Sequence, residues 1–560
     1  MTTKKSEGQK KSSARTRRTF LQQGLTAGGA LALTLARVSA ASAGPSAAAA
    51  PPRAFALEEA TIDQLREGLA SGRYTARSLA RLYLERIGQI DRRGPALNSV
   101  IELNPDAFAI AAARDRERPG RNSPREFGPL HGIPVLIKDN IDTADRMTTT
   151  AGSLALAGSI PLRDSFVADR LRAAGAVILG KTNLSEWANF RSSHSTSGWS
   201  GRGGQTRNPY ALDRNPCGSS SGSGTAVAAS LCAVAVGTET DGSVVCPSSS
   251  NGLVGIKPTV GLVGRSGIIP ISHSQDTAGP MARTVRDAAI LLGALTGADS
   301  RDRVTDESRG KAFADYTQFL DPRGLNGARV GVARKFWGFN DRVDKLMDAA
   351  IDALKKLGAV VIDPANIETA EQFGDSEFEV LLYEFKAGLN KYFGELGPRA
   401  PVRTLKEVIE FNDRHKEREM PYFGQDILIK AEAKGPLTEK TYRDALGKNH
   451  RLSRREGIDA VMKKHRLDAM VAPTGSPAWP TDLINGDHTT GGFSSPAAVA
   501  GYPHITVPAG FDHGLPVGLS FFGGAYSEPK LIKYAYAYEQ ATKHRRPPRF
   551  ARTINLTGLT

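Results

Sequence analysis

The feature of this sequence that most constrains its fold is an alternation of short apolar runs with stretches of helical periodicity. Val135–Ile137, Ala176–Leu179 and Ala233–Val236 predict buried strands. Phe166–Ala174 and Ala226–Cys232 lie between these runs and predict helices. Strands that alternate with helices typically form a parallel or mixed sheet between helical layers. The sequence therefore predicts an α/β fold with a central, mixed, twisted β-sheet covered by helices on both faces.

Residues 300–465 are richer in charge and in long helix candidates than the rest of the chain. Val343–Leu357 and Phe378–Phe393 predict two such helices, and Arg329–Val332 and Val360–Ile362 predict a strand pair. The region is expected to be either a helical cap or a peripheral half of one large domain. Three later runs are expected to complete the sheet: Ala469–Ala472, His504–Val507 and Val517–Phe522.

The N-terminal residues have the order of an export signal. Several Lys and Arg residues precede the apolar stretch Gly24–Ala36, which small residues follow. Thr16–Leu21 (TRRTFL) is similar to a twin-arginine signal, and the 13 residues of the apolar stretch fall short of the ~20 that a membrane span needs. We therefore predict a twin-arginine signal peptide at 1–43, the twin-arginine translocase as a partner during export, a periplasmic or secreted location, and no stable membrane insertion after signal removal. The alternative is a basic, disordered tail.

Composition divides the remaining chain. A linker is predicted at 44–54, followed by one large domain at 55–550 and a C-terminal tail at 551–560. The domain is expected to open with helices at Ile62–Leu69 and Ala76–Ile87. The first 44 residues hold eight Lys or Arg and one acidic residue, so the formal net charge falls from +15 to +8 without them. This mild excess, without a dense basic run, argues against nucleic-acid binding.

The three cysteines are Cys217, Cys232 and Cys246. They are too few for a disulfide framework, their spacing matches no zinc site, and the chain contains no HExxH motif. We therefore expect an enzyme without metal or cofactor.

Pro216–Gly224 (PCGSSSGSG) is the most unusual stretch of the chain. Its glycines permit tight turns, and its serines supply hydroxyls at a helix N-terminus. A flexible linker has a similar composition. A linker is poorly placed here, however, because the stretch runs directly into a predicted buried helix.

A second polar segment, Gly237–Ser243 (GTETDGS), follows the strand Ala233–Val236. A tight turn after a buried strand exposes backbone N–H groups, which can form an oxyanion hole. Ser243 would face the same point. Gly, Thr, Asp and Ser are also typical of ordinary surface turns, which the local sequence alone favours.

Lys138 ends the apolar run Val135–Ile137. A lysine in this position is often exposed at its tip. If the side chain is buried instead, desolvation disfavours the ammonium form and leaves an amine that can act as a base. Keeping a lysine neutral at pH 7 requires roughly 4 to 5 kcal/mol, which only a well-enclosed site supplies.

Together, the strings GIPVLIKDNID (132–142), CGSSSGSG (217–224) and GTETDGSVVCP (237–247) resemble the amidase signature family. The resemblance covers nearly all of the chain after the signal and is weakest at 300–460. It implies a catalytic triad of Ser243 as nucleophile, Ser219 on a cis peptide bond, and Lys138 as base. It also implies that the backbone N–H groups of Thr240, Asp241, Gly242 and Ser243 hold the oxyanion.

Within this family, NLSEWANFRSSHSTSGWSGRGGQTRNPY (183–210) and VGLVGRSGIIPISHSQDTAGPMARTV (260–285) are similar to the branch that removes C-terminal amides from peptides. Two residues depart from the wider family. Asp241 stands where glycine is usual, and Cys246 stands where relatives that act on carboxylate-bearing substrates can have arginine. The resemblance therefore implies a peptide or small-molecule amide as substrate and a pocket without an anion clamp at that point. Three aromatic residues near the motif support this expectation: Trp187, Phe190 and Trp199.

Several alternatives remain at this point. The substrate could be another acyl, aryl or fatty amide, or the chain could be an amidotransferase-type subunit. Gly218–Gly222 also matches the G-x-S-x-G motif of a Ser-His-Asp α/β-hydrolase, with Ser220 as the nucleophile. That triad would need one of three later histidines: His488, His504 or His513.

Overall fold

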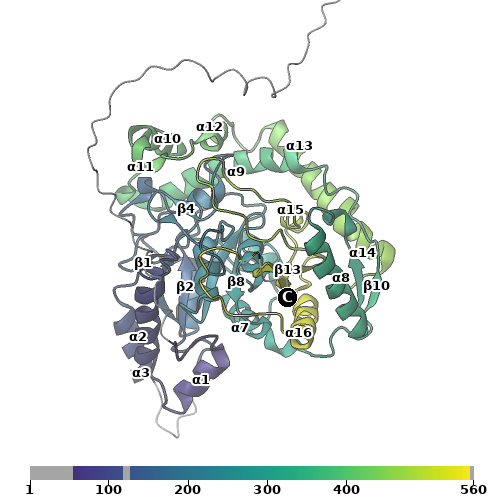
Figure 1. Ribbon diagram of the computed structural model, residues 1–560. Helices are drawn as coiled ribbons and strands as arrows, with labels where there is room; N and C mark the ends of the chain where they lie inside the picture. Colours follow the sequence, from purple (N-terminus) through teal and green to yellow (C-terminus); the bar gives the residue numbers. More distant parts are fainter. Residues whose placement is uncertain (1–53, 118–126, 555, 557–560) are drawn as a thin grey trace, which may run out of the picture. The chain divides into compact units, whose positions relative to one another are not determined.

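The computed structural model describes residues 54–117, 127–554 and 556, and these residues belong to one compact unit (Figure 1). The predicted signal peptide, and the predicted linker up to residue 53, lie outside the described residues. Part of the predicted C-terminal tail contacts the domain. Ala551 forms a β-bridge with Ala211, and Thr553 Oγ1 donates to Asp213 at 2.6 Å.

One mixed sheet of 11 strands runs through the described part of the chain (Figure 1). Its strand order is β1-β3-β2-β6-β8-β7-β12-β13-β11-β9-β10. The pairs β3–β2, β2–β6, β11–β9 and β9–β10 are parallel, and the other neighbours are antiparallel. The strands are β1 Val100–Leu103, β2 Pro134–Lys138, β3 Val177–Thr182, β6 Val234–Glu239, β7 Val254–Lys257, β8 Thr277–Ala282, β9 Arg329–Val332, β10 Val360–Ile362, β11 Ala469–Pro473, β12 His504–Asp512 and β13 Leu515–Phe522. A separate two-stranded sheet consists of β4 Trp199–Ser200 and β5 Gly204–Gln205.

Helices pack against this sheet along its whole width. Helices α2 and α3 contact β3, α5 contacts β6 and β2, α7 contacts β8, and α8 and α16 contact β12. The helices are α1 Ile62–Ala70, α2 Ala76–Arg86, α3 Ala107–Arg116, α4 Phe166–Ala173, α5 Ser221–Ala228, α6 Val245–Ser250, α7 Val285–Leu295, α8 Asp341–Lys356, α9 Gly374–Glu395, α10 Leu405–Arg414, α11 Lys416–Glu419, α12 Asp426–Glu432, α13 Lys440–His450, α14 Asp459–His465, α15 Ser495–Ala500 and α16 Glu528–Thr542. No helix in the described ranges is long and apolar enough to span a bilayer.

The predicted α/β fold with a central mixed sheet is confirmed. Strands β2, β3 and β6 are buried at every position, which explains their apolar runs, because a sheet covered on both faces needs no polar side. One predicted helix differs. The helix expected at Ala226–Cys232 begins at Ser221 and ends at Ala228, since the Ser/Gly segment itself forms the first turns.

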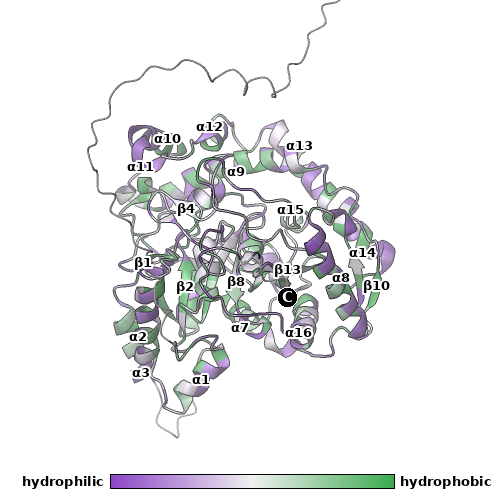
Figure 2. Cartoon of the chain, viewed as in Figure 1, coloured by the Kyte–Doolittle hydropathy of each residue, from purple (hydrophilic) through white to green (hydrophobic). Residues whose placement is uncertain are grey.

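The region 300–465 belongs to the same domain, because β9 and β10 extend the main sheet beside β11. Its first long helix, α8, begins after the N-cap Asn340, whose side chain accepts from two backbone N–H groups. One side of α8 buries Val343, Met347, Ile351 and Leu354. Figure 2 shows outer helices that carry both hydrophilic and hydrophobic residues, as expected for helices with one face on a core.

Candidate active site

Lys138 lies at the end of β2 and is fully buried. Its Nζ contacts Ser219 Oγ at 2.7 Å, Thr238 Oγ1 at 2.9 Å and Thr238 O at 3.2 Å. Burial lowers the pKa of the Lys138 side chain to about 7, although the carboxylates of Asp276 and Glu239 oppose the shift. A substantial fraction of Lys138 is therefore a neutral amine at neutral pH, and its lone pair can accept a proton from Ser219.

The Ser/Gly segment places Ser219 against this lysine. The peptide bond between Gly218 and Ser219 is cis, and Ser219 is fully buried. The Ser219 carbonyl accepts from the Ser185 N–H at 3.1 Å, so the residue is fixed from both its backbone and its side chain. The Ser219 hydroxyl is thus held at the lysine without any contribution from a histidine.

The turn after β6 holds Ser243. Gly242 has a φ of 76°, in the left-handed region that glycine adopts without strain. The carboxylate of Glu239 accepts from the N–H groups of Gly242 at 3.0 Å, Val244 at 2.8 Å and Val245 at 3.0 Å. Within the part of the chain that the structure describes, the N–H groups of Thr240, Asp241 and Ser243 have no hydrogen-bond acceptor. The turn therefore offers three backbone donors, whereas the fourth predicted donor, that of Gly242, already binds Glu239.

The two serine segments are joined through their backbones. The Ser220 N–H donates to the Ser243 carbonyl at 3.2 Å, and Ser220 Oγ bridges the backbone of Thr238 by accepting from its N–H at 3.1 Å and donating to its carbonyl at 3.0 Å. Among the described residues, no hydrogen bond joins the Ser243 hydroxyl to that of Ser219. Ser243 is 8% exposed, whereas Ser219 is fully buried. The structure thus brings Lys138 and Ser219 into contact, with Ser243 on the adjoining segment.

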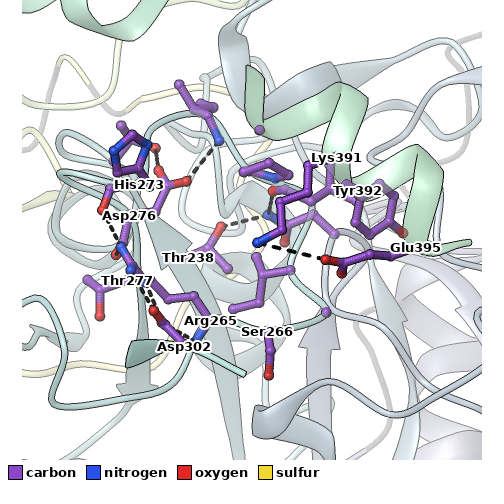
Figure 3. A pocket seen from close by; sticks show the side chains of 18 of the residues that line it. Thr238, Arg265, Ser266, His273, Asp276, Thr277, Asp302, Lys391, Tyr392 and Glu395 are labelled. Carbon is purple, nitrogen blue, oxygen red and sulfur yellow. Dashed lines mark hydrogen bonds and ion pairs between the residues drawn. The ribbon is translucent and has the colours of Figure 1, made fainter. Parts of the chain in front are cut away.

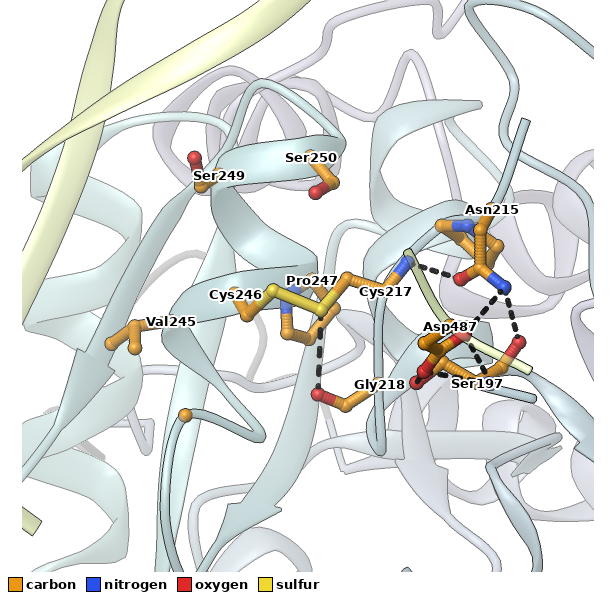
Figure 4. Close-up of a disulfide and its surroundings, with 12 residues drawn as sticks. Ser197, Asn215, Cys217, Gly218, Val245, Cys246, Pro247, Ser249, Ser250 and Asp487 are labelled. Carbon is orange, nitrogen blue, oxygen red and sulfur yellow. Dashed lines mark hydrogen bonds between the residues drawn. A yellow bond between two sulfur atoms is a disulfide. The ribbon is translucent and has the colours of Figure 1, made fainter. Parts of the chain in front are cut away.

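A disulfide, which the sequence analysis did not predict, also joins the two segments. Cys217 and Cys246 are bonded, with Cα atoms 6.0 Å apart (Figure 4). Cys232 is free and buried. Cys217 lies two residues before Ser219, and Cys246 lies three residues after Ser243. Three cysteines are too few for a framework of several bridges, but they allow this single bridge.

The alternative triad around Ser220 is not assembled. Both hydrogen bonds of the Ser220 hydroxyl go to the backbone of Thr238. The candidate histidines lie elsewhere: His504 Nε2 contacts Ser520 Oγ at 2.6 Å, His488 contacts Asp482, and His513 contacts Asp512. A Ser-His-Asp hydrolase needs a histidine on its nucleophile, so this alternative is wrong.

A cavity of about 430 Å³ borders the site at Thr238, the residue that binds Lys138 (Figure 3). Asn140, Thr238 and Thr240 line the part of it that adjoins the site. Its apolar lining comes from Ile268–Ile271, and its charged lining includes the ion pair of Arg265 with Asp302 at 2.7 Å. The three aromatic residues that the sequence suggested for substrate binding do not line it. They are buried and pack against other side chains instead: Trp187, Phe190 and Trp199.

Three residues with a direct effect on the site were not predicted from the sequence. Thr238 accepts from both Lys138 Nζ and Asn140 Nδ2, Glu239 binds the backbone of the turn, and Asp276 accepts a hydrogen bond from Thr240 Oγ1. Thr238 and Glu239 lie within the GTETDGS string, where a carboxylate directly before a turn was the available signal. In the described ranges, no group of His, Cys, Asp and Glu side chains has the arrangement of a metal site.

The model of the amidase family matches residues 78–532. The chain belongs to the amidase family. It is 46% identical to a probable amidase of Arabidopsis thaliana over 89% of this chain and 92% of that protein. The crystal structure of native peptide amidase from Stenotrophomonas maltophilia is 53% identical and superposes with a TM-score of 0.84, over 89% of this amidase and 100% of that chain. One subunit of the glutamyl-tRNA(Gln) amidotransferase of Alkaliphilus metalliredigens is 33% identical over 86% of this amidase and 96% of its own length. The protein is therefore an amidase signature enzyme, a hydrolase of amide C–N bonds.

Proposed function

We propose that this amidase cleaves its substrate through an acyl-enzyme on Ser243, with Ser219 and Lys138 as a proton relay. The observation that carries the proposal is the 2.7 Å contact between Ser219 Oγ and a fully buried lysine whose pKa burial lowers to about 7. A serine is a weak nucleophile unless a neighbouring base takes its proton. Ser219 is the hydroxyl of the Ser/Gly segment that contacts the lysine, and the Ser220–Ser243 backbone bond supports the approach of Ser243 to it.

In the first half of the reaction, Ser243 Oγ attacks the amide carbonyl carbon while its proton passes to Ser219 Oγ, and the Ser219 proton passes to Lys138 Nζ. The C–N bond then breaks, and the leaving nitrogen takes a proton from Ser219, which Lys138 replenishes. Ammonia departs and an ester of Ser243 remains. Water then attacks the ester through the same relay, and the carboxylate leaves. The hydrogen bond between Ser219 and Ser243 is expected to form with substrate, since catalytic contacts often tighten only in the complex.

Three backbone donors support oxyanion stabilisation at the turn. We assign this role to the N–H groups of Thr240, Asp241 and Ser243, which have no other acceptor in the described ranges. Gly242 supports the same turn through its left-handed conformation while its own N–H binds Glu239. Preorganised donors of this kind act on the charge that develops in the transition state.

We propose C-terminal carboxamides of peptides as the substrate. The 53% identity to peptide amidase supports this choice. The position of Cys246 supports it too, because a disulfide sulfur there gives no cation for a substrate carboxylate. The test is to incubate the purified chain with an amidated peptide and follow ammonia and the mass of the peptide. Conversion of the carboxamide to carboxylate with every internal peptide bond intact supports the proposal. Internal cleavage, or activity only on short acyl, aryl or fatty amides, contradicts it, and a requirement for additional protein chains favours an amidotransferase.

We also propose that the enzyme is exported through the twin-arginine route. The disulfide supports this, because disulfides persist mainly in oxidising compartments and this route carries folded proteins. Replacing Arg17 and Arg18 by lysine should retain the active precursor in the cytoplasm. Unchanged export of that variant contradicts the proposal.

A further inference from the structure

The side chain of Asp241, in the oxyanion turn, is bound by a residue outside the turn. Its Oδ2 accepts from Ser495 Oγ, at the start of α15, at 2.6 Å. Its Oδ1 is buried and meets no conventional donor among the described residues. A buried carboxylate oxygen without a donor is unfavourable, so its surroundings should contain a proton that satisfies it.

Glu377, in the first turn of α9, is the neighbour that can supply this proton. It is buried, and its carboxyl group contacts that of Asp241. Gln275 Nε2 donates to Glu377 Oε1 at 2.9 Å and to the Thr240 carbonyl at 3.3 Å. Glu377 thus reaches the turn by two routes: directly at Asp241, and through Gln275 at Thr240.

The hydrogen-bond partners of the two carboxyl groups indicate that Glu377 and Asp241 hold one proton between them. If Glu377 is protonated, its O–H donates to Asp241 Oδ1, while its other oxygen accepts from Gln275 and Asp241 Oδ2 accepts from Ser495. Every carboxyl oxygen then has a partner. If both carboxyl groups are ionised, two buried negative charges touch and Asp241 Oδ1 stays unsatisfied. Burial, together with the charge of Asp241, raises the pKa of Glu377 well above its usual value, in agreement with this assignment.

The charges around the pair make a second negative charge unfavourable. Lys257 on β7 is a cation that interacts with Asp241, but it also faces Glu239 on β6 and Glu528 on α16. Asp276, which binds Thr240, faces Lys138 and Arg265. Ionisation of Glu377 would therefore add another carboxylate to a cluster in which Lys257 already faces three.

We propose that Glu377 and Asp241 share one proton, and that this hydrogen bond, together with Gln275, holds the oxyanion turn in place from helix α9. Glu377 and Gln275 are positioning residues, since they act through Asp241 and Thr240. This inference rests on the proposed function of the turn. The proposal predicts that activity falls at alkaline pH, because the pair then loses its proton and the turn is displaced. This decline is separate from the rise in activity that follows deprotonation of Lys138 at lower pH.

The test compares pH profiles of kcat and KM for the full-length enzyme. Glu377→Gln keeps a donor for Asp241 but cannot ionise, so its kcat should stay within about threefold of wild type on the plateau and the alkaline decline should disappear. Glu377→Leu has no donor and should lower kcat by about tenfold or more at every pH, with little change in KM. The matched control is Glu379→Gln on the same helix, whose partner is Lys434 and whose pH profile should equal that of wild type.

An alkaline decline in Glu377→Gln equal to that of wild type, or no alkaline decline in wild type, overturns the shared proton. Asp241→Asn provides a second variant that also removes the proton, and its profile should lack the alkaline decline even if its rate is low. Circular dichroism of each variant checks that it is folded. The two proposals can fail independently. An active Ser243→Ala variant would contradict the proposed function. An unchanged alkaline decline in Glu377→Gln would contradict the shared proton even if Ser243 is essential.

Discussion

The two parts of the chain that meet at the oxyanion turn are built in opposite ways. The segment from Pro216 to Ser250 buries hydroxyls and a lysine-bound serine and contains a disulfide, and irregular segments separate its short helices and its strand. The region from Asp341 to His465 consists mainly of helices, and helices such as α8 bury apolar side chains on one face. This helical region nevertheless supplies Glu377, which contacts Asp241 in the oxyanion turn.

This difference shows how the two parts divide stability and chemistry. Buried polar groups need hydrogen-bond partners, and substitutions of Ser219 and Ser243 in the Pro216–Ser250 segment are expected to change the reaction. Apolar helix faces contribute mainly through burial and capping, so substitutions in the helical region should change the free energy of unfolding. The exceptions are positions such as Glu377, where a helix reaches the turn. The following variants test this division.

The largest effect is expected for Ser243→Ala, which removes the proposed nucleophile. Turnover should fall by a factor of roughly 10⁴ to 10⁶, since loss of a nucleophile leaves only the contribution of binding and the oxyanion hole. Assay of ammonia release measures this. Ser220→Ala is the control: it should keep most of its activity but have a lower Tm, because the two hydrogen bonds to the Thr238 backbone are lost. Loss of activity in Ser220→Ala with an active Ser243→Ala would reverse the two roles.

Ser219→Ala and Lys138→Ala should be severely impaired, but less than Ser243→Ala, because water can replace part of the relay. Members of such a relay act as one unit, so the double variant should be little worse than either single one. The measurement is kcat for ammonia release from the two single variants and the double variant. Additive losses would show that the two residues act independently.

In the wild type, activity should rise with pH through the pKa of Lys138, about 7. Below that pH the side chain is an ammonium group and cannot accept a proton, and above it the amine can. The measurement is kcat/KM against pH. An ascending limb with its midpoint near pH 4 or near pH 10 contradicts a desolvated lysine as the base.

A smaller effect is expected when the Cys217–Cys246 bridge is removed. A bridge across a sequence separation of 29 residues is expected to stabilise a protein by about 3.6 kcal/mol. The double variant Cys217→Ala/Cys246→Ala should therefore have a lower Tm and a moderately lower kcat, since the two serine segments keep only their hydrogen bonds. Reducing agent should lower the Tm of wild type but not that of the double variant. An equal response of both proteins contradicts the assignment of the bridge.

The smallest effect is expected in the helical region. Asn340→Ala removes the N-cap of α8 and should cost about 1 kcal/mol of unfolding free energy. Thermal unfolding measures the loss, and kcat/KM should be unchanged. A change in kcat without a change in Tm would contradict the proposed division of roles.

The sequence predicted the fold class and most strands near the site, because their apolar runs are short, buried and interrupted by helices. It placed Lys138, Ser219 and Ser243 together only through the family resemblance, since each segment alone also fits an ordinary loop. The bridge between Cys217 and Cys246 was missed because no count of cysteines reveals which segments become neighbours. Contacts such as that of Glu377 with Asp241 depend on the packing of a distant helix, which local patterns do not encode.

The most direct test of the central claim is to map the covalent adduct that a fluorophosphonate probe forms with the purified enzyme. Such a probe reacts with a serine that a neighbouring base activates. Peptide mass spectrometry of wild type should find the label on Ser243, and Ser243→Ala should carry none. A label on Ser219 or Ser220 in the wild type would contradict the account.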